Sequence, residues 1–439
     1  MEISENVREL VACRIRLKEK FIAGETYIPV AKAIYDDREV EAVVQAALDF
    51  RIVDGELSHE FEREMARFMQ VRHATFCNSG SSANLLAFNA IMSPKLGSKA
   101  LKPGDEVITC AVGFPTTVAP IIQAGCIPVY VDATVGNYNP TPFMVEDAIT
   151  DKTRAIFLAH TLGNPFDVKA IKDIADRNEL WLIEDCADAI GGEFDGKKLG
   201  TFGNLSTASF YPAHMMTTGE GGMVFTDSPM LNQIVRSLRD WGRDCWCAPA
   251  KDNTCGKRFC QSQKVRGELP EGYDHKYVYS HVGFNLKSTD LQAAIGLEQL
   301  KKLPQFIEMR RNNWEMMSNK MMDAELDKYF ILPHHYSLAN PSPFGFLLTV
   351  KENAKFSRNE LTQYLEEHKI GTRNLFAGNL TKHPGFLGKG RVADTIPKAD
   401  FIMGHTFWIG CHPGINIDMI EYIVDTLLEF VESKNDKRI

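Results

Sequence analysis

Three features are missing from this sequence, and each absence argues against a class of protein. No run of about 18 consecutive apolar residues occurs, so the sequence predicts no transmembrane helix. No internal repeat or low-complexity tract occurs, which argues against repeat architectures. Positive charge is not in excess, because 49 Lys and Arg stand against 57 Asp and Glu, a net charge of −8. This acidic balance gives no support to nucleic-acid binding.

A secretion signal is not recognisable either. The first residues, "MEISENVRELVACRIRLKEKF", are charged and lack an apolar core segment. We therefore expect a cytoplasmic protein, whose ten cysteines would not form a disulfide framework in that reducing compartment. The cysteines would serve packing, metal binding or redox chemistry. Five are expected to be buried small apolar residues: Cys13, Cys77, Cys110, Cys126 and Cys411.

The order of strand-like and helix-like segments predicts an α/β fold. The chain has 439 residues, enough for a large domain and a smaller one. Residues 1–24 read as a helical segment and residues 25–300 as the large domain. There, apolar segments such as "HATFC" and "LWLIED" alternate with helical ones, the pattern of a doubly wound, mostly parallel sheet. A Cys-rich insertion falls at about 240–280, and residues 301–439 are expected to form a small α+β domain.

The segment "CNSGSSANLLAF" places a turn of small residues between a strand and a helix. The free backbone N–H groups and the positive end of the helix dipole at such a turn attract a phosphate. Gly80, Ser81 and Ser82 are the candidate residues. Small residues at this place also serve as simple helix caps, which is the alternative.

Three further segments carry side chains suited to a flat, charged cofactor. Asp185 ends the apolar strand "LWLIED", where parallel sheets bind ligands and where a carboxylate can hold a proton on a pyridine nitrogen. Phe114, in "VGFPTTVAP", can stack on a ring or pack in the core. Ser209 can donate a hydrogen bond to a phosphate, and His214 follows five residues later. Each signal is modest alone, so their order and spacing carry the hypothesis.

That order resembles the sugar aminotransferase family of fold-type I pyridoxal-phosphate enzymes. The resemblance extends over about residues 25–430 and includes "HVGFNLKSTDLQAAIGLEQL" at 281–300. It implies that the Gly80–Ser82 turn and Ser209 bind the cofactor phosphate. It also implies that Phe114 stacks on the cofactor ring and that Asp185 binds the ring nitrogen.

The same resemblance implies three contacts at the rim of the site. Asn285 would reach the cofactor phosphate of the neighbouring subunit, which implies a homodimer. Asp188 would lie near the ring hydroxyl, where the family usually has Gln or His. Arg373, in "IGTRNLF", is a candidate substrate contact.

The loop "SFYPAHMMTTGEGG" (209–222) departs from the family in one decisive residue. The family has a cofactor-binding lysine where this chain has His214, and no lysine occurs between Lys198 and Lys251. Imidazole cannot form the Schiff base that transamination requires, but it can transfer a proton near neutral pH. The cofactor is therefore expected to be free pyridoxamine 5'-phosphate.

Within the family, histidine in place of lysine marks the 3-dehydrases of dideoxysugar biosynthesis. The resemblance implies removal of the C3 hydroxyl of a nucleotide-linked 4-keto-6-deoxyhexose, with a CDP-linked sugar favoured, on the route to 3,6-dideoxyhexoses of lipopolysaccharide O-antigens. The alternatives are a cluster-free dehydratase recharged by glutamate, a pyridoxal-phosphate aminotransferase, and a catalytically silent regulator or scaffold.

Four cysteines lie close together in the insertion: Cys245, Cys247, Cys255 and Cys260. In a cytosolic protein such a group favours metal binding, and thiolates suit zinc or an iron–sulfur cluster. A structural, metal-free loop is the remaining alternative. The residues alone do not choose among these.

The resemblance to the 3-dehydrases implies a [2Fe–2S] cluster on a C-x-C-x7-C set, which Cys245, Cys247 and Cys255 reproduce. The family's fourth, distant cysteine would fall at Ala187, so we expect the adjacent Cys186 to take its place, with Cys260 as the alternative. Such a cluster implies a partner, an NADH-dependent flavin iron–sulfur reductase that supplies electrons.

Overall fold

The fold is dominated by one large twisted sheet. The computed structural model describes residues 2–16, 20–247, 253–259 and 267–435. Eight strands lie in the order β1-β9-β8-β5-β4-β2-β3-β14. Only β9 runs antiparallel to its neighbours, so the predicted mostly parallel sheet is confirmed. The strands are β1 (His73–Cys77), β2 (Glu106–Cys110), β3 (Ile127–Val131), β4 (Thr153–Ala159), β5 (Trp181–Asp185), β8 (Leu205–Ser209), β9 (Gly222–Thr226) and β14 (Arg391–Val392).

Helices cover both faces of this sheet because neighbouring strand residues point to opposite faces. In β4, Phe157 and Leu158 belong to two different apolar clusters. One cluster packs under α4 (Gly80–Ile91), α5 (Pro115–Gln123) and α8 (Pro229–Arg239). The other packs under α3 (Glu56–Met69), α6 (Pro142–Asp147) and α7 (Val168–Arg177). The sheet is therefore doubly wound, as predicted.

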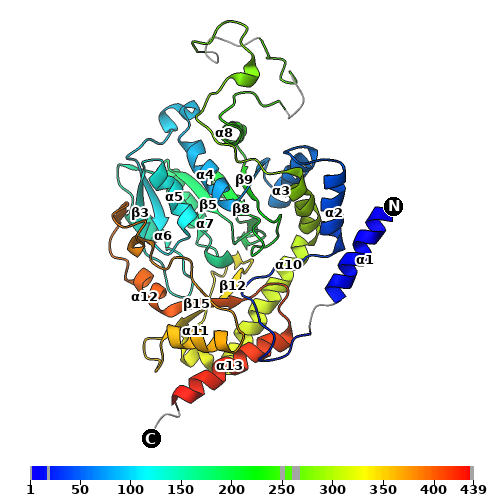
Figure 1. Cartoon of the computed structure of the whole chain (residues 1–439). Coiled ribbons are helices and arrows are strands. Elements are labelled where there is room, and N and C mark those ends of the chain that lie inside the picture. The colour runs from blue at the N-terminus through cyan, green and yellow to red at the C-terminus, as the bar shows by residue number, and fades with distance from the viewer. Residues whose placement is uncertain (1, 17–19, 248–252, 260–266, 436–439) are drawn as a thin grey trace.

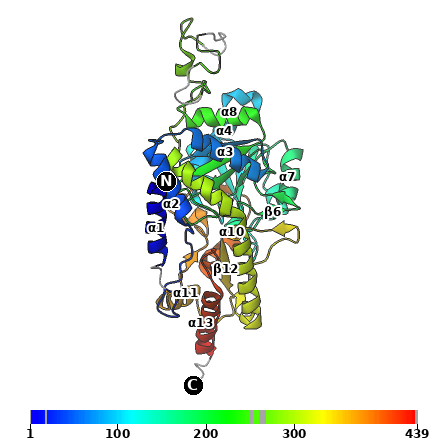
Figure 2. The same cartoon turned by 90° about the vertical axis from the view of Figure 1, so that its right-hand side faces the viewer.

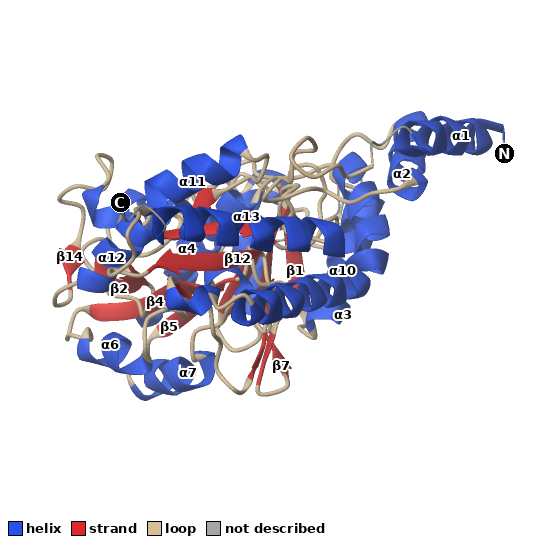
Figure 3. Ribbon diagram, turned by 90° about the horizontal axis from the view of Figure 1, so that it is seen from below, coloured by secondary structure: helices blue, strands red, loops and turns tan. Residues whose placement is uncertain are grey.

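A second, smaller sheet has its own core. It contains β10 (Phe330–Ile331), β12 (Gly345–Val350), β15 (Thr406–Gly410) and β13 (Arg373–Asn374). Figure 3 shows α11 (Arg358–Glu367) and α13 (Ile417–Asn435) over this sheet. The nearby α12 (Pro397–His405) leads into β15. A third, three-stranded sheet consists of strands of two residues each, in the order β11 (Ala339–Asn340), β6 (Glu193–Phe194) and β7 (Lys197–Lys198).

The large sheet with its helices forms a large lobe, and the second sheet with its helices forms a small lobe. The two lobes share chain segments. The long helix α10 (Asp290–Asp323) buries Ala293 in the large core and Met317 in the small one. Ile28 bridges to Ile370, which ties the start of the chain to the small lobe. Conversely, β14 joins the large sheet although it comes from the C-terminal part. The division of the chain at residue 300 stays a prediction.

The N-terminal helices and the Cys-rich insertion lie at the margins of the molecule (Figures 1 and 2). Helix α1 (Glu2–Arg16) packs on α2 (Asp37–Leu48), where Arg8 Nε donates to Glu41 Oε2 at 2.8 Å. The insertion follows α8 and projects away from the sheet. No helix of the described residues has the length and apolarity to cross a membrane.

The burial of five cysteines was predicted from sequence, and four of these predictions are confirmed. Cys77, Cys110, Cys126 and Cys411 are buried. Cys13 is exposed, so the prediction was wrong for this residue. It lies on α1, which packs on α2 at the edge of the molecule and leaves much of its surface in solvent.

Candidate active site

A cavity of about 850 Å³ opens where the parallel strands end and the small lobe begins. Strands β1, β2, β4, β5 and β8 all run in the same direction, so their carboxyl ends meet at this edge, the usual ligand site of such sheets. The cavity brings together most of the predicted site residues: Gly80, Ser81, Phe114, Asp185, Asp188, Ser209, His214 and Arg373.

The predicted phosphate turn is the N-terminus of α4. Ser79 caps the helix, because its Oγ accepts a hydrogen bond from Ser82 N at 3.1 Å. Gly80 and Ser81 occupy the first helical positions, whose N–H groups have no acceptor within the helix. Ser82 does not line the cavity, and its hydroxyl accepts a hydrogen bond from Ser79 Oγ at 3.0 Å. The turn therefore offers the backbone of Gly80 and Ser81 to a phosphate.

Two glycines are required by close approach at this turn. A Cβ on Gly80 would lie 2.4 Å from Ser209 Cβ, and one on Gly222 would lie 2.2 Å from Ser79 O. The Gly-Glu-Gly-Gly motif thus has a packing role, since Gly222 lets β9 pass directly against the turn. Ser209, at the end of β8, is held beside Gly80 and faces the cavity.

Asp185 is a buried carboxylate without a cationic partner. It is 4% exposed and accepts hydrogen bonds from Thr117 Oγ1 at 2.7 Å and Asn84 Nδ2 at 2.8 Å. Burial raises its pKa, and these two donors oppose that effect. No Lys, Arg or His of the described chain forms an ion pair with it. A protonated pyridine nitrogen would supply the missing positive charge, so the site fits a pyridoxal-type ring.

Phe114 supplies the aromatic surface. Phe114 directly precedes α5, lines the cavity and is 48% exposed, which is unusual for a phenylalanine. Its edge contacts Phe376 in a T-shaped pair with ring centroids 6.0 Å apart. This pair holds the Phe114 ring at the cavity wall, where it can stack on a flat cofactor.

His214 faces the same cavity and is positioned from two sides. Its Nδ1 lies 3.1 Å from Asp188 Oδ1, within ion-pair distance, although the hydrogen-bond angle is not met. Its backbone carbonyl accepts a hydrogen bond from Arg310 Nη2 at 3.1 Å. Arg310 is fully buried on α10 and also donates to Phe344 O. The histidine is thus fixed between a carboxylate and the helix that joins both lobes.

Sequence reasoning missed Arg310 and Lys32. Lys32 lines the cavity from the segment near the chain start that is bound to the small lobe. Arg373 lines it from β13, with a side chain 61% exposed and 4.0 Å from Glu366. Neither Arg310 nor Lys32 lies in a recognisable motif, so only the folded chain assigns them.

Asn285 does not line the cavity of its own chain. It is exposed, and its Oδ1 accepts a hydrogen bond from Lys287 Nζ at 2.7 Å. It forms an isolated bridge with Asp240, at the base of the projecting insertion. Its predicted contact with a neighbouring subunit stays a prediction.

The structure separates Cys186 from the cysteines of the insertion. Cys186 is completely buried, and its Sγ groups with His160 and Glu184 in the core. Burial raises the pKa of its thiol well above the ordinary value. The cavity is lined by the next residue, Ala187, whose side chain has no ligand atom. Cys186 therefore does not face the cavity. Its role as the fourth ligand stays a prediction, and Cys260 lies outside the described residues.

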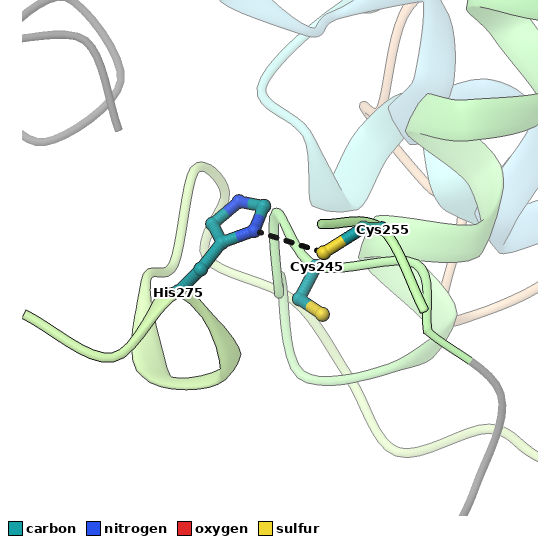
Figure 4. A group of neighbouring side chains, drawn as sticks. All are labelled: Cys245, Cys255 and His275. Atoms are coloured by element: carbon teal, nitrogen blue, oxygen red, sulfur yellow. Dashed lines mark hydrogen bonds between the residues drawn. The ribbon is translucent and has the colours of Figure 1, made fainter. Parts of the chain in front are cut away.

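Cys245, Cys247 and Cys255 do come together. They line one small space with His275. Figure 4 shows Cys245, Cys255 and His275, whose ligand atoms all lie within 4.8 Å of one another. The set of thiols and imidazole is chemically suited to zinc or an iron–sulfur centre.

The doubly wound sheet with this cavity defines a protein of the fold-type I aminotransferase-like class. Residues 34–428 match the DegT/DnrJ/EryC1/StrS aminotransferase family, and the chain belongs to that family.

Individual relatives match over nearly the whole chain. The chain is 50% identical to a dTDP-4-dehydro-2,6-dideoxy-D-glucose 3-dehydratase of Saccharopolyspora spinosa, over 94% of this chain and 88% of the relative. It is 48% identical to the lipopolysaccharide biosynthesis protein RfbH of Salmonella typhimurium, over 98% of both chains. A crystal structure of a GDP-4-keto-6-deoxymannose-3-dehydratase mutant with bound GDP-perosamine superposes with a TM-score of 0.81 at 29% identity, over 92% of this chain and 100% of that one.

Proposed function

We propose that this protein is a pyridoxamine-phosphate-dependent 3-dehydratase of a nucleotide-linked 4-keto-6-deoxyhexose. The observation that carries the proposal is His214, which occupies the cavity where a cofactor-linking lysine would stand and contacts Asp188. Relatives named as 3-dehydratases support it. A pyridoxal-phosphate aminotransferase is the less favoured candidate, because His214 has no amine to bind the cofactor.

The residues of the cavity divide the work. The amides of Gly80 and Ser81, with Ser209, hold the phosphate, and Phe114 stacks on the ring. Asp185 keeps the pyridine nitrogen protonated. When bound, the cofactor supplies an amine that condenses with the substrate ketone and a ring that accepts electrons.

His214 moves the proton. With pyridoxamine phosphate bound, the imidazole would be placed to take the proton of the cofactor's methylene carbon, and the cofactor would supply the electron sink for loss of the C3 hydroxyl of the sugar. Asp188 holds the Nδ1 side of the ring, so Nε2 is the nitrogen that takes the proton. Asp188 acts as a positioning residue for His214 rather than at the ring hydroxyl.

The substrate carries a nucleoside diphosphate, and the cavity offers two cations for it. Lys32 and Arg373 both line the cavity, and charged side chains bind phosphate oxygens strongly. The named relatives act on dTDP- and GDP-linked sugars, whereas the sequence motifs favour CDP. An assay with all three nucleotides identifies the base.

The insertion supplies the redox part of the proposal. Cys245, Cys247 and Cys255 would hold a [2Fe–2S] cluster that passes two electrons, one at a time, from an NADH-dependent flavin iron–sulfur reductase. With protons from solvent, those electrons would supply the reduction that a 3,6-dideoxy-4-ketohexose product requires. If no cluster is present, recharging of the cofactor by glutamate is the alternative route.

We also propose a homodimer. Asn285 is exposed and lies outside its own cavity, which leaves it available to the cofactor phosphate of the partner. The paired subunits would then complete each other's sites.

The test is turnover by the purified protein and its His214→Asn variant. We expect the wild-type protein to consume the 4-keto sugar when supplied with pyridoxamine phosphate, reductase and NADH. The variant should bind the cofactor and not turn over. Normal turnover in His214→Asn would remove the histidine from the mechanism and refute the proposal.

A further inference from the structure

The cluster on the projecting insertion includes a residue that the cysteine spacing does not predict. His275 belongs to the short 3-10 helix η3 (His275–Tyr277), some twenty residues after Cys255. It lines the same small space as Cys245, Cys247 and Cys255. None of these four residues lines the cofactor cavity. The site is therefore a separate one, formed within the insertion (Figures 1 and 4).

The imidazole faces the sulfurs. His275 Nδ1 lies 3.9 Å from Cys255 Sγ, and the Cys245 sulfur lies within 4.8 Å of both residues' ligand atoms. Cys255 N donates to Cys247 Sγ at 3.3 Å, which ties the third cysteine to the group. His275 is only 3% exposed although it stands on a projecting loop. A buried imidazole pointed at thiols is the arrangement of a metal ligand.

The other ring nitrogen of His275, Nε2, faces a carboxylate, as is usual for metal-binding histidines. His275 Nε2 lies 3.1 Å from Asp244 Oδ2, and Asp244 Oδ1 accepts from Lys95 Nζ at 2.5 Å. A carboxylate on the non-ligating nitrogen fixes the tautomer and directs the other nitrogen to the metal. Lys95 comes from the large lobe, so this chain of contacts also anchors the insertion.

The backbone around the site is fixed without a metal. His275 N donates to Arg258 O at 2.8 Å, and Asp244 N donates to Val278 O at 2.8 Å. Arg258 Nε also donates to Asp274 Oδ2 at 3.0 Å. Three separate stretches of the insertion are thereby joined next to the sulfurs. Such preorganisation is expected of a built ligand site and not of a loose cysteine-rich loop.

We propose that His275 is the fourth protein ligand of the metal centre, beside Cys245, Cys247 and Cys255. This inference rests on the [2Fe–2S] cluster of the proposed function and replaces Cys186 as its fourth ligand. Cys186 is fully buried and groups with His160 and Glu184. Imidazole ligands occur on [2Fe–2S] centres and raise their reduction potential relative to all-cysteine ligation. A Cys₃His centre would therefore accept an electron more readily.

The test uses the full chain, purified without oxygen, and four variants. They are His275→Ala, His275→Cys, Cys186→Ala and, as a matched control, His281→Ala. His281 stands at the base of the same insertion, where its ring nitrogens bond to Ser93 and Ser237. Iron and sulfide contents are measured first, followed by pulsed electron paramagnetic resonance of the reduced cluster for nitrogen coupling.

We expect the wild-type, Cys186→Ala and His281→Ala proteins to hold equal iron and sulfide and to show coupling to a ligand nitrogen. His275→Ala should lose iron. His275→Cys should keep iron and sulfide, lose the nitrogen coupling and have a lower reduction potential. Loss of iron in Cys186→Ala, or an unchanged spectrum in His275→Cys, would overturn the assignment.

The metal content of the wild-type protein separates the two claims. Zinc without sulfide would refute the redox part of the proposed function, and the zinc contents of His275→Ala and Cys186→Ala would still decide the ligand. Absence of any metal would refute both.

Discussion

His214 Nδ1 lies 3.1 Å from Asp188 Oδ1 at the wall of the cofactor cavity. The two residues come from different loops, one after β8 and one after β5, and their side chains are 16% and 10% exposed. A carboxylate at this nitrogen orients the imidazole. The pair therefore resembles a base with its orienting acid.

The first prediction removes the charge of that acid. Asp188→Asn keeps the size of the side chain but removes the carboxylate charge that faces His214 Nδ1. We expect the rate of dehydration to fall by about a hundredfold, the usual scale for impaired proton transfer, with cofactor affinity little changed. Steady-state rates and cofactor titration check this. An equal loss of cofactor affinity would instead place Asp188 at the cofactor ring.

Replacing His214 by lysine should restore the chemistry of the ordinary family loop. In His214→Lys we expect the new amine to form a covalent bond with the aldehyde of pyridoxal phosphate. Borohydride reduction followed by peptide mass spectrometry would locate the bond. His214→Gln serves as the control and should give none. Failure to find the bond would mean that position 214 does not face the cofactor.

The phosphate turn is tested by Gly80→Ala. The added Cβ would lie 2.4 Å from Ser209 Cβ, so either the turn or β8 must shift. We expect cofactor affinity to fall by about tenfold or more, since such crowding costs over about 1 kcal/mol. Gly404→Ala is the matched control, because a Cβ there meets no atom within 4 Å outside its own stretch of α12. Unchanged affinity in Gly80→Ala would argue against phosphate binding at this turn.

Arg373 is the candidate contact of the substrate diphosphate. Its side chain is largely exposed at the cavity, and its ion pair with Glu366 is long, at 4.0 Å. Loss of the side chain should therefore not unfold the protein. We expect Arg373→Gln to raise the KM for the nucleotide sugar by about tenfold, the scale of one charge-assisted hydrogen bond, with kcat nearly constant. A fall in kcat alone would contradict this role.

The buried side chain of His412 should make the free energy of unfolding depend on pH. It is buried, Gly414 N donates to its Nδ1, and its Nε2 donates to Pro29 O at 3.0 Å. Burial lowers its pKa to about 4, whereas an unfolded chain has about 6.5. Between these values the unfolded state binds more protons, so the free energy of unfolding rises with pH.

We therefore expect His412 to contribute about 2 kcal/mol to the loss of stability between pH 7 and pH 5. Urea unfolding at pH 7 and at pH 5 measures this loss. The free energy of unfolding of His412→Gln should fall between the two pH values by about 2 kcal/mol less than that of the wild-type protein. His335→Gln, at an exposed position, should retain the wild-type dependence. Identical slopes in the two variants would contradict the prediction.

The fold was predictable because its signals are local. Apolar strands such as "LWLIED" alternate with amphipathic helices, and the turn at Gly80 combines a helix cap with small residues. The departure at His214 was visible for the same reason, since a conspicuous loop contains it. These features depend on neighbouring residues along the chain, so the sequence determined the sheet, the cofactor turn and the absent lysine.

The tertiary structure decided which distant residues meet. It turned Cys186 into the core and Ala187 toward the cavity, a one-residue difference set by the turn that follows β5. It brought His275 to three cysteines and Asp188 to His214. Such contacts depend on how the chain packs in three dimensions, because the local sequence around a residue does not indicate which distant residues it will contact.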